Sequence, residues 1–439
     1  MHLSIVNRLS RAVLFGTALM VGLLAWTRDT GHRSTPSTIA IGAVYPASTG
    51  PPYARALALD ARSGHAFVAT TTGIRVLDIR TGATVRTIPH EGDGEPLALA
   101  TDTSTGHIIV VTGSDIQVLD GQTGAIVHRV AIPMYPLATT VDQRVGHAFV
   151  LDLGGRVSGG RVVVLDTRSG HPLPRMVIVR GDKRDLGDIA VDERAGRVFV
   201  TKRAAGTVSV FDTRSGALLA TTLVDLHRSF GTLAVAPTDG HVFVAGQTGV
   251  SMLDSRGRTV LRRTALGAAP VIMAVDERAH RLVAGDDVLD AFGNAHGITG
   301  VSVLDTRSGA LLRTVQVAPS DSGAALAVDE RRGRILVALQ GATDPLDGQT
   351  FTAPGRVLVF DAGTGALVRT VVAGYAPQAM AVDERDGRIM VLNDAVKVRV
   401  PDRWAWIPRW ARRWVPFLPS SGPSTRAMPG EVRILDVTR

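Results

Sequence analysis

One phrase recurs eight times along this chain of 439 residues, and it limits the fold more than any other feature. Two of its copies read LALDARSGHAFVA and LAVDERRGRILVA, and neighbouring copies are 40 to 54 residues apart. A second phrase, such as VSVLDTRSGALLRTV, follows each copy of the first. Self-similarity at this period is typical of repeat architectures. The anchor positions of the first phrase are Asp60, Asp102, Asp142, Asp192, Ala236, Asp276, Asp329 and Asp383.

Each unit contains four short runs rich in Val, Leu and Ile, separated by turns that contain Asp and Gly. Such runs predict four β-strands, A to D, joined as hairpins. A four-stranded unit of about 40 residues is the signature of a β-propeller blade. We therefore predict an all-β fold, a β-propeller of eight four-stranded blades, or seven if the fifth or eighth unit fails to form one.

The two ends of the chain predict how the ring closes. The last unit stops after its strand C, at Arg439, and has no strand D. A strand-like stretch, Ser37 to Pro46, precedes the first strand A and belongs to no unit. We expect this N-terminal strand to supply the missing outer strand, which makes residues 37–439 the propeller domain.

The fourth unit, RVFVTKRAAGTVSVFDTRSGALLATTLV, resembles a unit of the YVTN-repeat β-propeller proteins. The resemblance covers residues 50–439 and implies an extracytoplasmic protein. It implies little about activity, because one fold hosts many functions. The chain departs from the usual pattern of that family in having eight units and three long insertions.

The N-terminal 29 residues read as a signal peptide or a signal anchor. Arg8 and Arg11 precede an uncharged run, 12–27, and residues 30–36 form a linker. The run is short for a membrane span, which favours cleavage, but no clear cleavage site follows it, which favours retention. Both interpretations place the propeller outside the cytoplasm.

Composition excludes several kinds of chemistry. The chain has no Cys, so disulfides, thiolate metal sites and cysteine nucleophiles are excluded. The formal net charge is +8, but Arg is scattered along the whole chain instead of forming a patch. We therefore expect no nucleic-acid partner.

The repeated acids are interpreted as turn residues. An Asp ends strand C in all eight units, and in most of them a Gly follows four residues later. An Asp at the start of a turn accepts backbone N–H bonds, and Gly takes the positive φ that the turn requires. Eight equivalent copies cannot all be one active site. These residues are Asp78, Asp120, Asp166, Asp212, Asp254, Asp305, Asp361 and Asp436.

Function is expected where loop length varies. The loops between strands B and C are long in three consecutive units, at 285–300, 340–355 and 393–430. Alternating strand direction places B–C and D–A loops on the same face of the ring. We therefore expect these insertions to form one canopy over one side of that face.

Two observations address catalysis. In the first insertion, four side chains offer oxygen and imidazole ligands for a divalent metal, although their spacing matches no metal-binding loop and solvated loop acids are the alternative. Asp188 is the only charged residue at the inner positions of the strands A, so the channel lacks the polar set that a propeller lactonase would need. The four candidate ligands are Asp286, Asp287, Asp290 and His296.

Four of the five tryptophans lie between Pro401 and Pro419, in the third insertion. Three interpretations stay open: a lid packed on the loop face, a membrane-interface element at 402–417, or a hot spot that binds a protein or a glycan. The candidate contact residues are Trp404, Trp406, Arg409, Trp410, Arg413 and Trp414.

The sequence therefore favours a non-catalytic, extracytoplasmic binding or scaffold propeller that uses its B–C/D–A loop face. The alternative is a metal-dependent lactonase or hydrolase with the same fold. A divalent metal is the one cofactor that the sequence brings into consideration.

Overall fold

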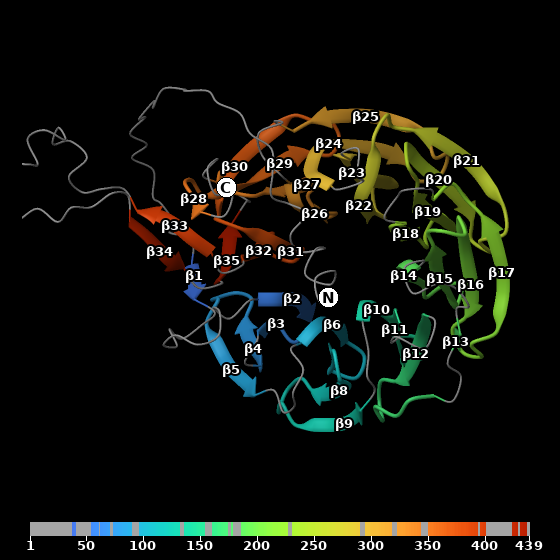
Figure 1. The fold of residues 1–439 in the computed structure, drawn as a ribbon, viewed down its shortest axis with the longest axis horizontal. Helices are drawn as coiled ribbons and strands as arrows, with labels where there is room; N and C mark the ends of the chain where they lie inside the picture. The colour runs from blue at the N-terminus through green and yellow to red at the C-terminus, as the bar shows by residue number, and fades with distance from the viewer. Residues whose placement is uncertain are drawn as a thin grey trace, which may run out of the picture.

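Each of the eight units folds into one four-stranded antiparallel sheet in the computed structural model, and the sheets follow one another around a ring (Figure 1). Strands pair in the order A–B–C–D, with strand A nearest the central channel and strand D at the rim. The prediction of a β-propeller with eight blades is confirmed. The structure describes residues 37–40, 54–60, 62–70, 73–89, 96–131, 136–153, 160–173, 177–178, 186–226, 231–289, 295–317, 323–343, 350–393, 396–400, 424–428 and 431–436.

The strands of blades one to four, in chain order, are β2 (Ala54–Asp60), β3 (His65–Thr70), β4 (Gly73–Asp78), β5 (Thr84–Pro89); β6 (Pro96–Asp102), β7 (His107–Thr112), β8 (Asp115–Asp120), β9 (Ile126–Ala131); β10 (Pro136–Asp142), β11 (His147–Asp152), β12 (Arg161–Asp166), β13 (Val177–Ile178); β14 (Leu186–Asp192), β15 (Arg197–Lys202), β16 (Thr207–Asp212) and β17 (Leu218–Leu223).

The strands of blades five to eight are β18 (Leu233–Ala236), β19 (His241–Ala245), β20 (Gly249–Asp254), β21 (Val260–Ala265); β22 (Ala269–Asp276), β23 (Arg281–Leu289), β24 (Ala295–Asp305), β25 (Leu311–Gln316); β26 (Gly323–Asp329), β27 (Arg334–Leu339), β29 (Gly355–Asp361), β30 (Leu367–Gly374); β31 (Pro377–Asp383), β32 (Arg388–Asn393), β35 (Glu431–Asp436) and β1 (Ser37–Ala40). Three further strands lie outside the blades: β28 (Thr350–Phe351), β33 (Val396–Val400) and β34 (Ser424–Met428).

Strand β1 completes the eighth blade, as the sequence predicts. It pairs antiparallel with β35, from Ser37 opposite Ile434 to Ala40 opposite Glu431. Apolar side chains of blades one and eight also form one buried cluster, which includes Val68 and Leu392. The first and last blades are therefore in direct contact.

Strands B and C carry the core. Their side chains are buried on both faces, because each blade packs between two neighbours. The third residue of strand B is an aromatic ring in four blades, Phe67, Phe149, Phe199 and Phe243, and all four are almost fully buried. Strand D has one covered face only, so its burial alternates along the strand.

The C–D turns confirm the interpretation of the repeated acids. Asp78 Oδ1 accepts hydrogen bonds from Thr81 N (2.7 Å) and Thr81 Oγ1 (2.8 Å), and Gly82 takes a φ of 72°. These hydrogen bonds hold the pKa of Asp78 below its usual value. Asp120, Asp166, Asp212, Asp305 and Asp361 make the same contacts with the Ser or Thr three residues later.

The turn between strands A and B also connects neighbouring blades. Glu193 Oε1 in blade four accepts from Gln143 N in blade three (3.3 Å), and Arg144 Nη1 in blade three donates to the carbonyl of Glu193 (2.9 Å). Blades seven and eight repeat both contacts through Arg332 and Glu384. The Glu and Arg of these turns therefore tie one blade to the next, in addition to shaping the turn.

In blade three, the described part of the outer strand is β13 together with a bridge just before it. Pro172 and Pro174 precede it in the sequence. Pro172 still forms a bridge with Leu165 of β12, and Leu173 N donates to the carbonyl of Val164 (2.8 Å), so the contact with β12 begins before β13.

A buried contact between blades is present at one boundary and missing at another. Thr167 Oγ1, just after β12, donates to Asp102 Oδ2 of the preceding blade (2.5 Å). In blade seven the same repeat position is Ala362, and Asp276 Oδ2 of the preceding blade has no hydrogen-bond partner among the described residues. Because Asp276 is fully buried, this oxygen lowers stability.

Replacing Ala362 with Thr should therefore stabilise the protein. We expect Ala362→Thr to raise the free energy of unfolding by about 1 kcal/mol, because the new hydroxyl can donate to Asp276. Thr167→Ala should lower it by about 1–3 kcal/mol, because Asp102 loses a buried partner. Urea denaturation of both variants and the wild type measures the difference. A destabilised Ala362→Thr would contradict the proposed role of this contact.

Candidate functional site

Two of the three insertions fold together into an extra sheet, which we call the side sheet (β28, β33 and β34). Strand β28, from the insertion of blade seven, pairs parallel with β33, from the insertion of blade eight. Strand β33 pairs antiparallel with β34, from Val396 opposite Met428 to Val400 opposite Ser424. The side sheet therefore links blades seven and eight on the B–C loop side, and it lies at the periphery of the ring in Figure 1.

The side sheet has a small core of its own. Phe351 of β28 and Val398 of β33 are buried together with Ala376, which lies between β30 and β31. The ring of Phe351 meets the ring of Tyr375 edge to face, with centroids 6.3 Å apart. Gly341 N also donates to the carbonyl of Tyr375 (2.7 Å). These contacts fix the side sheet to the D–A loop of blade seven.

The insertion of blade six has a different structure. It lengthens the hairpin of β23 and β24, where Asp287 is opposite Ile298 and Leu289 is opposite Ala295. Among the described residues, no strand of this hairpin pairs with the side sheet.

The tryptophan segment joins the end of β33 to the start of β34. Its candidate contact residues, Trp404, Trp406, Arg409, Trp410, Arg413 and Trp414, lie outside the described residues. The stem that carries this segment is the β33–β34 hairpin. The N-terminal residues 1–36 also lie outside the description, and within the described part of the chain we find no helix suited to crossing a membrane.

The four candidate metal ligands are only partly described. Asp287 lies on β23 and His296 on β24, but their side chains are outside the description, as is all of Asp290. Asp286 is 4 % exposed, and its Oδ2 accepts a hydrogen bond from Ser302 Oγ (2.5 Å). Among the described residues, no three acidic or histidine side chains form a group that suits a metal ion.

Asp286 is a carboxyl group in an unusual environment. Burial raises its pKa to about 7, and the hydrogen bond from Ser302 offsets only part of that effect. The same repeat position in blade three is Asp152, whose Oδ2 forms an ion pair with Arg161 (2.8 Å) on the facing strand. In blade six the facing residue is Gly300, so that cation is missing.

The raised pKa predicts a dependence of stability on pH. The folded protein holds the Asp286 proton more tightly than the unfolded chain, so the free energy of unfolding decreases as pH rises from 3.8 towards about 7. At pH 8 we expect Asp286→Asn to be more stable than wild type by about 2–4 kcal/mol. The advantage should shrink towards pH 5 in urea denaturation curves.

Asp152→Asn is the matched control for this experiment. It removes the negative charge that pairs with Arg161, so we expect it to destabilise the protein at all pH values from 5 to 8. An advantage of Asp286→Asn that does not change with pH would contradict the raised pKa.

Asp188, the charged residue at an inner position, connects blades four and five. Its Oδ2 accepts from Leu233 N (2.9 Å) and its Oδ1 from Ile189 N (2.8 Å). Thr201 Oγ1 adds a bond to the carbonyl of Gly231 (2.8 Å). Burial raises the pKa of Asp188, although both backbone bonds oppose the shift. Both carboxylate oxygens thus hold the backbone, which is a structural role.

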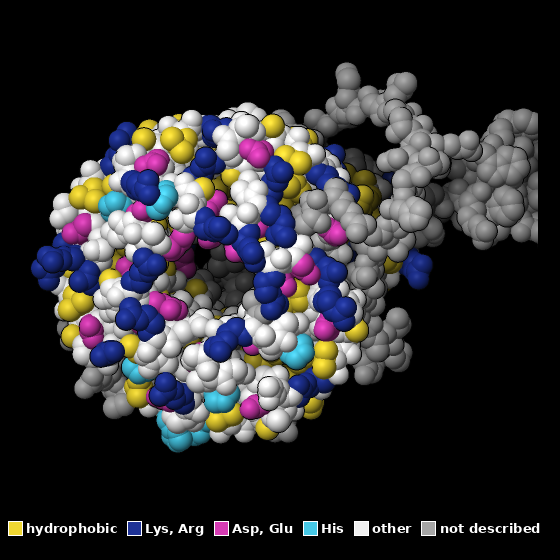
Figure 2. All heavy atoms as spheres, turned by 180° about the vertical axis from the view of Figure 1, so that it is seen from behind, with side chains coloured by type: hydrophobic (Ala, Val, Ile, Leu, Met, Phe, Trp, Pro, Cys, Tyr) yellow, Lys and Arg dark blue, Asp and Glu magenta, His cyan; other side chains and the backbone are white. Residues whose placement is uncertain are grey.

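One face of the ring is rich in charge around the central opening, as Figure 2 shows. Lys and Arg side chains alternate there with Asp and Glu. The His residues whose side chains the structure describes begin strand B or lie in or near an A–B or C–D turn. His side chains are visible on this face, so it is the face of the A–B and C–D turns. Its Glu and Arg residues include those that bond from blade to blade.

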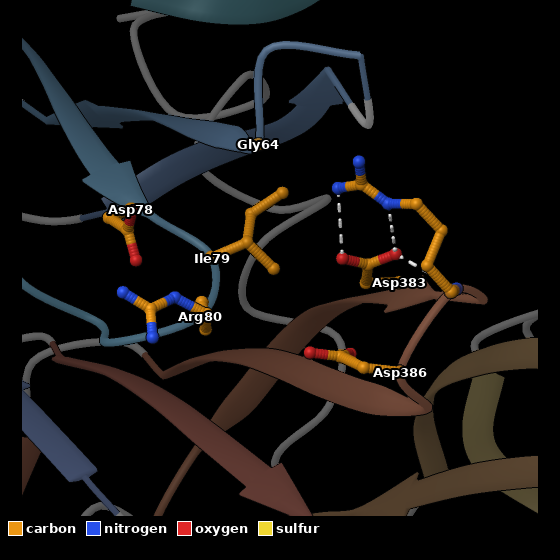
Figure 3. A pocket seen from close by; sticks show the side chains of 7 residues that line it. Gly64, Asp78, Ile79, Arg80, Asp383 and Asp386 are labelled. Carbon is orange, nitrogen blue, oxygen red and sulfur yellow. Dashed lines mark hydrogen bonds and ion pairs between the residues drawn. The ribbon is translucent and has the colours of Figure 1, made fainter.

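The boundary between blades eight and one contains a small cavity of about 330 Å³ on the turn side (Figure 3). Its charged groups largely satisfy one another, because Arg385 Nε and Nη2 donate to the two oxygens of Asp383 (both 3.2 Å). Burial alone would raise the pKa of Asp383, but the bonds from Arg385 lower it. The cavity offers a polar recess but no pair of an acid and a base. Its lining residues are Gly64, Asp78, Ile79, Arg80, Asp383, Arg385 and Asp386.

Comparison with known proteins supports the fold class and no narrower assignment. No family model matches the chain, and no curated protein matches it in sequence. Among solved structures, Sqt1 of Saccharomyces cerevisiae aligns with a TM-score of 0.58 and 12 % identity over 78 % of this chain and 93 % of that chain. The dihydro-heme d1 dehydrogenase NirN, in complex with DHE, aligns with a TM-score of 0.55 and 13 % identity over 73 % of this chain.

The alignment covers 66 % of the NirN chain. BamB of Moraxella catarrhalis aligns with a TM-score of 0.46 and 18 % identity over 65 % of this chain and 82 % of that chain, which is too weak to support an argument. At these identities the likeness shows the fold alone. The chain is a β-propeller of eight four-stranded blades.

The candidate acidic residues whose side chains the structure describes do not gather into one site. Asp188, Asp286 and Asp383 are each committed to neighbours inside the fold. The sequence analysis missed the side sheet and its exposed cations Lys397 and Arg399, although the alternation VKVRV in the third insertion is a strand signal.

Proposed function

We propose that this propeller is a non-catalytic binding or scaffold protein that works outside the cytoplasm. Its partner, a protein or a glycan, contacts the B–C/D–A loop face next to the side sheet. The observation that carries the proposal is the side sheet itself. Insertions from two consecutive blades pair with each other and share a core, although other units form four-stranded blades without such insertions.

The tryptophan segment is the proposed contact region. Trp404, Trp406, Trp410 and Trp414, with Arg409 and Arg413, have the composition of binding hot spots. The segment starts and ends on the paired strands β33 and β34, which anchor its two ends against blades seven and eight. A rigid stem lowers the entropy lost when a loop binds.

The wider setting is part of the same proposal. The chain belongs to the YVTN-repeat propellers, residues 1–29 are a signal peptide or signal anchor, residues 30–36 a linker, and residues 37–439 the propeller. The repeat phrases and the apolar run 12–27 support these assignments. We expect neither nucleic acid nor a catalytic cofactor to bind.

The contact region is tested by cross-linking a tagged full-length chain in its host cells and quantifying the recovered partners. We expect Trp404→Ala/Trp410→Ala/Trp414→Ala to lower recovery of the main partner at least about tenfold, because buried aromatic anchors dominate binding energy. Arg168→Ala, at a C–D turn on the opposite face, is the control and should leave recovery unchanged. Equal recovery with both variants would contradict the assignment of the tryptophan segment as the contact region. If the partner is a glycan, glycan arrays with the same variants identify it.

The rival function, a metal-dependent lactonase or hydrolase, makes a different prediction. It requires a divalent metal held by Asp286, Asp287, Asp290 and His296. Because Asp286 is buried and bonded to Ser302, we expect native mass spectrometry to show no stoichiometric metal. A bound metal that is lost in Asp290→Ala/His296→Ala would favour the enzyme.

A further inference from the structure

The outer strands of the blades share an unusual composition. The described strands D, and β1 in blade eight, contain Arg86, Arg129, Arg262, Arg263, Arg313 and Arg369 but no Asp or Glu. Acidic residues are instead concentrated in the turns. Five of the eight outer strands therefore have a positive charge, whereas β13, β17 and β1 contain no charged residue.

The rim is also apolar. Among the described residues, every exposed large apolar side chain except Leu97 lies on an outer strand. Figure 2 shows apolar side chains around the edge of the turn face. Exposed apolar side chains on strand edges are a liability unless something covers them. The rim of blades one and seven contributes Val85, Leu367, Val368 and Val372.

The side sheet adds exposed cations next to this rim. Along β33 the buried Val398 alternates with the exposed Lys397 and Arg399, so these two cations point away from the core of the side sheet. Arg426 of β34 is also exposed, but it pairs with Val398 and therefore lies on the other face. The strands β28, β33 and β34 contain no acidic residue. In Figure 1 the side sheet, β1 and β5 follow one another along one side of the molecule.

The position of the N-terminal strand points to the same side of the molecule as the membrane-facing side. Strand β1 is the outer strand of blade eight, and the apolar run 12–27 ends only nine residues before it. Nine extended residues span about 30 Å. If the run is embedded in a bilayer, the outer edge of blade eight is held within about that distance of the membrane surface.

We propose that the outer side of blades seven, eight and one rests on a membrane that contains anionic lipids. Lys397 and Arg399 face the lipid headgroups, and Val85, Leu367 and Val368 enter the interface, an arrangement that peripheral membrane surfaces use. The central axis then lies along the membrane, and the loop face stays open to a partner. The proposal rests on the anchored, extracytoplasmic setting above but not on the tryptophan contact.

The absence of Cys from the chain makes a direct test simple, because one introduced Cys is a unique labelling site. Leu367→Cys in blade seven and Leu218→Cys in blade four occupy the same repeat position and replace side chains that are 54 % and 59 % exposed. Each full-length variant carries a fluorophore and is reconstituted in vesicles of phosphatidylcholine and phosphatidylglycerol with quencher-labelled headgroups. We expect quenching at position 367 to exceed that at 218 at least about threefold, since blade seven faces the membrane and blade four does not.

Charge is tested in the Leu367→Cys background. Lys397→Glu/Arg399→Glu should remove most of the quenching, because both side chains then repel anionic lipids. Vesicles of phosphatidylcholine alone should have the same effect, because the cations then have no anionic lipid to contact. Arg262→Glu/Arg263→Glu in blade five makes the same number of charge reversals on the rim away from the side sheet and should have no effect. Thermal unfolding of each variant verifies that the fold is retained.

Equal quenching at 218 and 367 would overturn the proposal and identify the rim arginines as protection against edge pairing. No quenching at 367, or quenching unaffected by charge reversal, would also overturn it. Partner recovery by the tryptophan variants is a separate measurement, so failure of the membrane surface is distinguishable from failure of the proposed binding function.

Discussion

Burial of both faces of strands B and C between neighbouring blades is the constraint on which the rest of the structure depends. No single four-stranded sheet of this sequence hides its apolar side chains, because Val, Ile and Leu occupy successive positions in strands B and C. Each blade therefore needs a neighbour on either side, and the series must close on itself. Closure explains why β1, far away in the sequence, pairs with β35 and why Val68 and Leu392 share a cluster.

Polar groups at the blade boundaries must follow the same geometry. A carboxylate buried between two blades is tolerated only where a neighbour supplies donors, as Thr167 does for Asp102 and as the backbone of Leu233 does for Asp188. At Asp276 one carboxylate oxygen has no hydrogen-bond partner among the described residues, and at Asp286 burial raises the pKa although Ser302 donates to it. These strained positions are defects in a regular pattern, and no substrate is needed to explain them.

The fold was predictable from the sequence because its determinants are local and repeated eight times. Turn residues such as Asp78 and Gly82 act within one hairpin, so their role follows from spacing alone. Even the fifth unit, where Ala236 replaces the anchor Asp, retains enough of the pattern to form a blade. The contacts between blades were not predictable in detail. Glu193 and Gln143, for example, are 50 residues apart in the sequence, and no local pattern predicts that they form a hydrogen bond.

The site was predictable only in its location. Variable B–C loops indicate where the ring departs from uniformity, but the parallel pairing of β28 with β33 joins segments from two insertions. Asp286 is bonded to Ser302 and lies opposite Gly300, which has no side chain. Neither feature tells, from the sequence, an acid that binds a metal from an acid with a structural role.

Uniform blades also explain where a new function can arise in such a ring. A and B strands, and C and D strands, are joined by tight turns whose Asp, Gly and Arg residues bond within the blade and to its neighbour, so a longer turn would break two sets of contacts. The B–C loops make fewer such contacts, and an insertion there leaves the pairing of the strands intact. The eighth blade tolerates the longest one, 393–430, because β32 and β35 still pair in full register from Asn393 opposite Glu431 to Arg388 opposite Asp436. Selection for binding can therefore act on the side sheet and its loop without changing the stability of the ring.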